Sequence, residues 1–133
     1  MVLLDTNICA YLMKGNFPSL NQRVLNVNAS DLAISAITLF ELEYGAAKAN
    51  WGAKRREDLN IFFSAFKVIP FEAQDAIAAG RIRAELVRSG IPIGAYDLQI
   101  AAQGVARGIT VVTHNTREFI RVPGISLEDW VEE

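Results

Sequence analysis

Residues 2–7 read Val-Leu-Leu-Asp-Thr-Asn, a short apolar run that ends in three polar side chains. Residues 2–4 have the length and composition of a buried strand, and Asp5 marks the carboxyl end of that strand. Residues 6–13 then favour a helix, which Gly15 stops. The chain therefore opens with a buried strand that leads directly into a helix, the first unit of an α/β fold.

The same alternation of strand and helix continues along the chain. We expect further strands at residues 32–34, 68–69, 109–112 and 125–127, the last at an edge of the sheet. We expect helices at residues 18–28, 36–50, 54–66, 72–89 and 96–107, and a short helical turn at 115–119. This order predicts an α/β fold, a three-layer α/β/α sandwich with a central, mainly parallel sheet. In such sheets ligands bind beyond the carboxyl ends of the strands.

Length and composition narrow the class of protein. The 133 residues fit a single domain over residues 1–133. A net charge of −2 argues against a protein that coats nucleic acid non-specifically. No apolar run approaches the roughly 18 residues that cross a membrane, and no basic region precedes the first apolar residues as in a signal peptide. We therefore expect a cytoplasmic protein that does not associate with membranes, and the single Cys9, which cannot form an internal disulfide, agrees with this expectation.

Two carboxylates fall at the ends of predicted elements. Asp5 follows the first strand, and two more oxygen-bearing side chains come directly after it. Asp97 lies at the start of the helix expected over 96–107, on the face that this helix turns toward the sheet. Asp5 alone can be interpreted as a helix N-cap, and Asp97 alone as a favourable charge in a first turn. Both interpretations stay open at this point.

Glu41 is a third carboxylate in an unusual setting. In the helix expected over 36–50, helical spacing places Glu41 on one face with Ile37, Phe40 and Tyr44. A carboxylate on an otherwise apolar face is unfavourable unless it is paired or binds a cation. The sequence leaves two interpretations, a salt bridge to an arginine or a bound metal ion.

Considered together, the three carboxylates favour a metal site. Acids gathered at one sheet edge repel one another and raise one another's pKa unless a cation offsets them. Oxygen ligands suit Mg²⁺, which keeps several waters and leaves room for a phosphate group. We therefore expect Asp5, Glu41 and Asp97 to hold Mg²⁺ for the hydrolysis of a phosphodiester bond.

A further polar cluster, residues 113–118, follows the strand expected at 109–112. Asn115 and Glu118 are candidates for a fourth corner of the same site. His114, the only histidine of the chain, is interpreted as an exposed loop residue.

Four blocks of the sequence resemble the signature of PIN-domain ribonucleases. They are Leu-Asp-Thr-Asn at 4–7, Ser-Ala-Ile-Thr-x-x-Glu at 35–41 with Tyr-Gly-Ala at 44–46, Gly-x-x-Asp-x-x-Ile-Ala at 94–101, and Val-Thr-x-Asn-x-x-Glu-Phe at 112–119. The blocks match the family in order and spacing and span nearly the whole chain. The short length and the stretch from Ile82 to Gly90 are similar to bacterial VapC toxins in particular.

This resemblance implies a PIN fold and an endoribonuclease that depends on Mg²⁺, with Mn²⁺ as a substitute. Asp5, Glu41 and Asp97 would form the metal-binding, catalytic triad. Many members of the family carry a fourth acid where this chain has Asn115, so a second metal ion would lack a ligand here and Asn115 would hold a metal-bound water. The resemblance also implies a homodimer and inhibition by a VapB-type antitoxin.

The resemblance further implies a substrate class. VapC toxins typically cut structured RNA at one place, often the anticodon loop of a tRNA, and the details of this sequence favour initiator tRNA. The alternative is a catalytically inactive PIN scaffold that binds only RNA or protein.

Surplus apolar residues predict where the antitoxin binds. The first helix carries Ile8, Tyr11 and Leu12 on one face, and residues 36–66 are rich in aromatic side chains. Among these, Phe62 and Phe63 are adjacent, so we expect them to face different neighbours. We expect the antitoxin's C-terminal segment to lie between the first helix and residues 36–66, with a basic side chain that reaches the acidic cluster.

Overall fold

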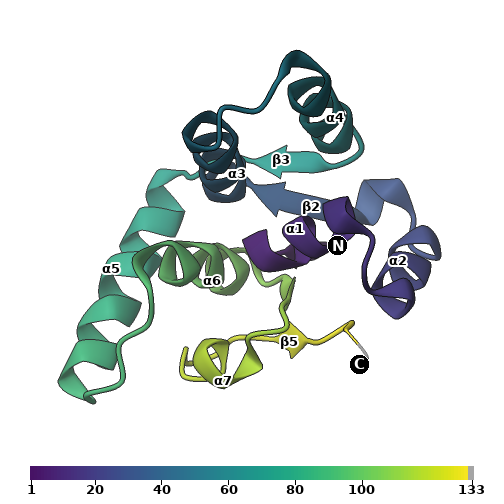
Figure 1. Ribbon diagram of the computed structural model, residues 1–133. Coiled ribbons are helices and arrows are strands. Elements are labelled where there is room, and N and C mark those ends of the chain that lie inside the picture. Colours follow the sequence, from purple (N-terminus) through teal and green to yellow (C-terminus); the bar gives the residue numbers. More distant parts are fainter. Residues whose placement is uncertain (132–133) are drawn as a thin grey trace.

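The computed structural model describes residues 1–131, and its centre is one sheet of five strands (Figure 1). In spatial order the strands are β3 (Lys67–Ile69), β2 (Leu32–Ser35), β1 (Val2–Leu4), β4 (Thr110–Val112) and β5 (Leu127–Glu128). Every neighbouring pair is parallel, so the carboxyl ends of all five strands lie along the same edge. The predicted α/β fold with a mainly parallel sheet is confirmed.

The order in which strands are added to the sheet reverses at β1. From β1 the chain adds β2 and β3 on one side, and it then returns to add β4 and β5 on the other. Leu4 at the end of β1 is paired with Ile34 of β2 and with Val112 of β4. The gap between the ends of β1 and β4 is therefore the switch point where doubly wound sheets bind ligands.

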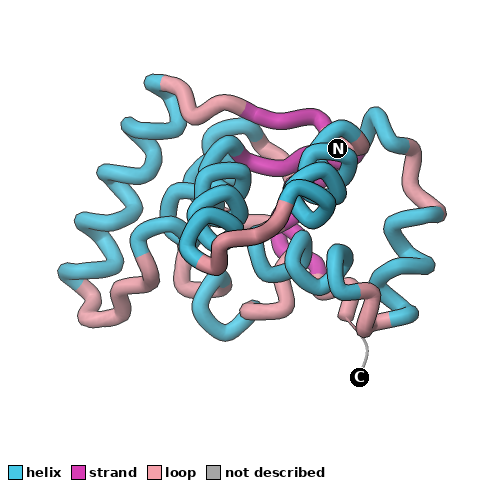
Figure 2. The backbone as a smooth tube through the Cα atoms, turned by 45° about the horizontal axis from the view of Figure 1, so that its top comes forward, coloured by secondary structure: helices cyan, strands magenta, loops and turns pink. Residues whose placement is uncertain are grey.

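Helices cover both faces of the sheet and make the three layers. They are α1 (Thr6–Lys14), α2 (Pro18–Leu25), α3 (Ala36–Lys48), α4 (Ala53–Ser64), α5 (Ala73–Arg88), α6 (Ala95–Arg107) and α7 (Thr116–Phe119), with a 3₁₀ turn over Ala29–Asp31. In both views α2 and α5 lie at opposite ends of the molecule (Figures 1 and 2). Within residues 1–131 no helix is long and apolar enough to cross a membrane.

Successive residues of each strand point to opposite faces of the sheet and pack into two separate hydrophobic cores. Leu3 and Val111 point to the face covered by α5, α6 and α7, where they join a cluster around Leu86, Ile100 and Phe119. The next residue in each strand points to the opposite face. There Leu4 and Val112 join Ile8, Leu20 and the half-buried phenylalanines of α4. A strand buried on both faces needs a continuous apolar run, which explains the composition of residues 2–4.

The structure corrects three details of the sequence-based expectations. The last strand is Leu127–Glu128 rather than 125–127, and Ile125 packs instead against the core cluster that contains Phe119. The second helix ends at Leu25, and a 3₁₀ turn occupies the residues before β2. Phe62 and Phe63 do not face different neighbours: both pack against the same core cluster, with their ring centroids 6.0 Å apart.

Gly104 allows α6 to approach β4 closely. A Cβ atom on Gly104 would lie 2.5 Å from Val111 Cγ2 and 3.3 Å from the carbonyl oxygen of Ile109. Because α6 carries Asp97 and β4 leads to Thr113, this close contact also sets the position of two site residues.

We predict that Gly104→Ala destabilises the protein by about 1–3 kcal/mol, because the added methyl group meets a buried strand. Gly80→Ala is the matched control, since nothing lies within 4 Å of that position and alanine favours a helix by roughly 0.5–1 kcal/mol. Denaturant unfolding of both variants measures the difference. Equal stabilities would show that α6 and β4 do not pack this tightly.

Candidate active site

Three carboxylates approach one another at the carboxyl edge of the sheet. Asp5 directly follows β1, Glu41 lies in α3 after β2, and Asp97 lies in the first turn of α6. The charges of Asp97 and Glu41 both contribute to raising the pKa of Asp5, and the charge of Glu41 contributes to raising that of Asp97. The fold therefore brings together three residues that are up to 92 positions apart in sequence, from Asp5 to Asp97.

Asp5 is held in place from both sides. Its backbone N–H donates to the carbonyl of Val112 at 3.0 Å, which ties the end of β1 to the end of β4. Its Oδ1 accepts the N–H of Ile8 at 2.9 Å, and its Oδ2 accepts the hydroxyl of Thr113 at 2.6 Å. Asp5 is thus the N-cap of α1, as one interpretation of the sequence had it, and the same carboxylate also belongs to the acidic cluster.

Burial raises the pKa of Asp5 to about 6, although its two hydrogen bonds oppose that change. The side chain is only 2% exposed, so its negative charge has lost most of its hydration. The neighbouring charges of Asp97 and Glu41 raise the pKa further. Asp5 therefore carries a charge near neutral pH at a considerable energetic cost unless a cation is close.

Thr113 begins a short chain of hydrogen bonds at the end of β4. Its hydroxyl donates to Asp5 and accepts the backbone N–H of Asn115 at 3.0 Å. The side-chain amide of Asn115 then donates to Glu118 Oε2 at 2.9 Å. Asn115 thus orients Glu118, whose charge is one of the causes that raise the pKa of Asp97.

Glu41 is held by hydroxyl groups rather than by a salt bridge. The hydroxyl of Thr6 donates to Glu41 Oε1 at 2.7 Å. The buried hydroxyl of Thr38 lies 3.0 Å from that of Thr6, and it is the donor of this pair because the Thr6 proton is already used. The arginine partner that the sequence left open for Glu41 is not found in the described part of the chain.

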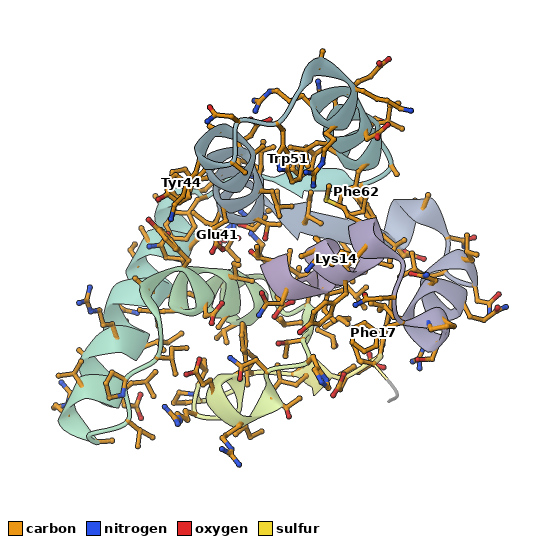
Figure 3. The ribbon with its side chains drawn as sticks, viewed as in Figure 1. Lys14, Phe17, Glu41, Tyr44, Trp51 and Phe62 are labelled. Atoms are coloured by element: carbon orange, nitrogen blue, oxygen red, sulfur yellow. The ribbon has the colours of Figure 1, made fainter. Side chains whose placement is uncertain are left out.

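The helix face that carries Glu41 is not a core face. Phe40 and Tyr44 are more than half exposed, whereas Ile37 packs against the core. Glu41 therefore lies at the border between the interior and the surface. Figure 3 shows it on α3 between Tyr44 on one side of that helix and Trp51 on the other.

Asp97 is the third member of the cluster. Gly94 is the N-cap of α6, and Asp97 lies three residues further on, in the first turn. Burial raises its pKa to about 6, with further contributions from the charges of Glu41 and Glu118. The helix dipole favours a negative charge at this position, yet the net shift is upward. Mutual repulsion and burial therefore outweigh the dipole.

The donor set fits a hard divalent cation. No salt bridge formed within residues 1–131 involves Asp5, Glu41 or Asp97, so no lysine or arginine offsets their charges. No three acidic, histidine or cysteine side chains of the described chain lie close enough to hold one ion by themselves. An ion such as Mg²⁺, which retains water and takes one or two carboxylates directly, matches this looser arrangement.

Sequence reasoning noted the polar side chain of Thr6 but did not predict that three threonine hydroxyl groups position the acids. Thr6, Thr38 and Thr113 donate to, or support donors to, Asp5 and Glu41. Thr38 and Thr113 are fully buried. The sequence signal that could have found them is a polar residue among apolar ones at the start of a helix or the end of a strand, because a buried hydroxyl group needs a hydrogen-bond partner.

His114 lies in the loop after β4, as predicted, but it is not a freely exposed residue. Its side chain is only 32% exposed, and its Nδ1 lies 3.0 Å from Asp129 Oδ2. Its ring also lies 6.3 Å from that of Tyr11, centroid to centroid. His114 therefore connects the β4–α7 loop to the C-terminal segment and to α1.

We predict that the metal-free protein becomes more stable as the pH falls from 7.5 to 5. A carboxyl group whose pKa rises from 3.8 to about 6 on folding binds its proton more tightly in the native state, so stability is lost as the pH rises through this window. For Asp5 the gain at pH 5 is about 1 kcal/mol.

Denaturant unfolding in the presence of EDTA measures this trend. Asp97→Asn removes one titrating group and should reduce the gain, whereas Glu85→Gln on the exposed surface of α5 should leave it unchanged. An identical pH dependence in all three proteins would contradict the electrostatic coupling described above.

Comparison with known proteins agrees with this geometry. The family described as PIN domain matches residues 2–125. The tRNA(fMet)-specific endonuclease VapC of Salmonella typhimurium is 44% identical over 128 residues, 96% of each chain. Ribonuclease VapC2 of Rickettsia felis is 39% identical over 129 residues, again 96% of each chain.

Solved structures give the same result. The chain matches one in the crystal structure of DNA-bound VapBC from Salmonella typhimurium with a TM-score of 0.91 and 44% identity, covering 97% of each chain. It matches one in VapBC2 from Rickettsia felis bound to a promoter DNA fragment with a TM-score of 0.88 and 35% identity, covering 98% of this chain and 99% of that one. With this fold and these relatives, the chain belongs to the PIN-domain family and, within it, to the VapC group.

Proposed function

We propose that this protein is a toxin endoribonuclease that hydrolyses an RNA phosphodiester bond with Mg²⁺, or Mn²⁺ as a substitute. The observation that carries the proposal is the pair formed by buried Asp5 and half-buried Asp97, whose pKa values are raised to about 6 with no basic partner among the described residues. An uncompensated acidic cluster at a sheet switch point suits a cation and a phosphate group. Relatives named endonuclease and ribonuclease support the same activity.

Each residue of the cluster has a distinct part in this proposal. A bound Mg²⁺ would polarise a phosphoryl oxygen and activate a water for in-line attack. Asp5 and Asp97 are the direct ligands, because they are the two carboxylates with the largest electrostatic need for a cation. Glu41, fixed by Thr6, holds water of the same ion shell. Thr113 fixes the orientation of Asp5.

Asn115 has a supporting part in this proposal. Its amide group donates to Glu118, so Glu118 is held beside the cluster as an additional negative charge. An amide carries no charge, and a second ion at this corner would therefore be bound more weakly than the first. Water held by Asn115 and Glu118 is consistent with catalysis by one metal ion.

The proposed substrate is a tRNA, with initiator tRNA as the specific candidate. The Salmonella typhimurium relative at 44% identity is named a tRNA(fMet)-specific endonuclease. The net charge of −2 favours recognition of one folded RNA over general binding to nucleic acid. The proposal includes a cytoplasmic location, where tRNA is found.

A VapB-type antitoxin is the proposed partner, and the structure offers it a groove. A recess of about 290 Å³ lies between α1, α3 and the start of α4, with Met13, Leu42 and Trp51 in its lining. Figure 3 shows Trp51 between α3 and α4 and Lys14 on the neighbouring α1. Glu41 also lines this recess, so a basic side chain of a segment in the groove can reach the acidic cluster. Similar solved structures are VapBC complexes.

We predict that Asp97→Asn and Glu41→Gln each lower the rate of RNA cleavage by at least about 100-fold, because each removes charge that offsets the ion and the transition state. The assay follows initiator tRNA with Mg²⁺, with EDTA and with Mn²⁺. EDTA should abolish cleavage, and Mn²⁺ should restore it.

The matched control is Glu57→Gln, which removes an exposed carboxylate of α4 away from the cluster. Full cleavage by purified Asp97→Asn would disprove the assignment. If the unmodified protein binds tRNA but never cleaves it in Mg²⁺ or Mn²⁺, the alternative of an inactive PIN scaffold is correct.

We predict that the cognate antitoxin protects α1 and residues 36–66 from hydrogen exchange. Trp51→Ala should weaken antitoxin binding by roughly 30-fold, since a large aromatic residue in a groove is a typical binding hot spot. The same variant should cleave RNA at the normal rate. Protection confined to α5 and α7 would place the antitoxin elsewhere.

A further inference from the structure

Three exposed aromatic side chains gather beside the acidic cluster. Phe40 and Tyr44 of α3 are 51% and 58% exposed, and Tyr96 of α6 is 44% exposed. Phe40 directly precedes Glu41, and Tyr96 directly precedes Asp97. Two helices thus each supply one acid and, from the adjacent position, one exposed ring. We call Phe40, Tyr44 and Tyr96 the aromatic recess.

The aromatic recess and the acidic cluster share a wall. A hollow of about 370 Å³ is lined by the three rings together with Glu41. The rings of Phe40 and Tyr96 meet edge to face, with their centroids 5.4 Å apart and an angle of 60° between their planes. Both residues keep about half of their surface exposed despite this contact, so a planar group can reach the rings.

A positive charge lies at the far side of the recess. The Lys48 ammonium is 5.8 Å from the centroid of the Tyr44 ring, one helical turn beyond it. Within residues 1–131 Lys48 forms no salt bridge, so its charge remains available. From the acids outward the surface therefore offers carboxylates, then aromatic rings, then an ammonium group.

We propose that the aromatic recess binds an unpaired nucleobase of the RNA next to the phosphate that is cleaved. Rings exposed beside a phosphate-processing site are the surface on which a base stacks when it has left its helix. The order of the groups along this surface is that of a nucleotide chain, with the reacting phosphate at the acids, the adjoining base on the rings and the next phosphate at Lys48. This inference rests on the proposed ribonuclease function and adds the form of substrate that the site accepts.

The recess is distinct from the groove proposed for the antitoxin. The groove lies on the side of α3 that faces α1 and α4, whereas Tyr44 points away from α4 on the opposite side of the helix (Figure 3). Glu41 is the residue that lines both. Substitutions in the two surfaces should therefore separate RNA binding from antitoxin binding.

The test uses a short single-stranded RNA that carries one 2-aminopurine, placed in turn at each position. An Asp97→Asn background keeps the RNA intact. Stacking of 2-aminopurine on a ring quenches its fluorescence, so one or two adjacent positions should be quenched on binding. Adding Tyr96→Ala should remove that quenching and weaken binding roughly 5- to 150-fold, the range for loss of one stacked base.

Tyr96→Phe keeps a ring and should keep both the quenching and the affinity. Phe40→Ala and Tyr44→Ala provide the same test from α3 if Tyr96→Ala does not fold. Leu25→Ala, on α2 and 80% exposed, is the control for loss of an exposed apolar side chain and should change neither. Quenching at no position, or unchanged RNA affinity in all three alanine variants, would overturn the proposal.

Two further outcomes distinguish this proposal from a dimer interface at the same surface and from the proposed ribonuclease function. If the alanine variants dissociate a dimer in sedimentation experiments while RNA affinity stays unchanged, the recess is an interface between two copies and the proposal is wrong. If the quenching follows the expected pattern but the unmodified protein cleaves no RNA, the proposed function fails and the base-binding recess stands.

Discussion

The repulsion between Asp5, Glu41 and Asp97 is the constraint on which the rest of this structure depends. Folding places the three charges together at the carboxyl edge of the sheet, although burial and proximity raise the pKa values of Asp5 and Asp97 to about 6. The fold tolerates this arrangement because neutral donors hold the acids: Thr113 and the Ile8 N–H hold Asp5, and Thr6 holds Glu41. Hydroxyl and amide groups orient a carboxylate without cancelling its charge, which a lysine or arginine would do. The cluster therefore keeps a negative charge that an external cation could offset, as the proposed function requires.

Another buried aspartate, Asp75, has the opposite kind of partner and the opposite pKa shift. Buried Asp75 is paired with Arg107 through two hydrogen bonds of 3.1 and 2.8 Å, and these bonds hold its pKa below the usual value despite burial. That carboxylate stabilises the packing of α5 on α6 and has no need of a cation. Both Asp5 and Asp75 have side chains that are almost inaccessible to solvent. Because its partners are neutral, Asp5 keeps a charge that a ligand can use, whereas the charge of Asp75 is offset by Arg107 and supports the fold.

Sequence alone could predict the sheet, because residues 2–4 and 111–112 are apolar on both faces, as is typical of strands in a parallel sheet covered by helices. It could also select Asp5, Glu41 and Asp97, since strand ends and helix starts are the places where a parallel sheet gathers side chains. It could not assign the exposure of α3, because Phe40 and Tyr44 have the spacing of a core face and only the position of α6 shows that they border a recess. Nor could it reveal that Phe62 and Phe63 share one cluster, which depends on how α4 lies beside β3.

Glu41 links the two surfaces that flank the acids, since it lines both the groove and the aromatic recess. A cation placed beside Glu41 from the groove would remove one of the charges that raise the pKa values of Asp5 and Asp97. The pKa values of both acids would then fall, and the electrostatic attraction of the cluster for a metal ion would weaken. Under the proposed function, a partner in the groove would therefore weaken metal binding without covering the recess, because the two surfaces meet the cluster on opposite sides of α3.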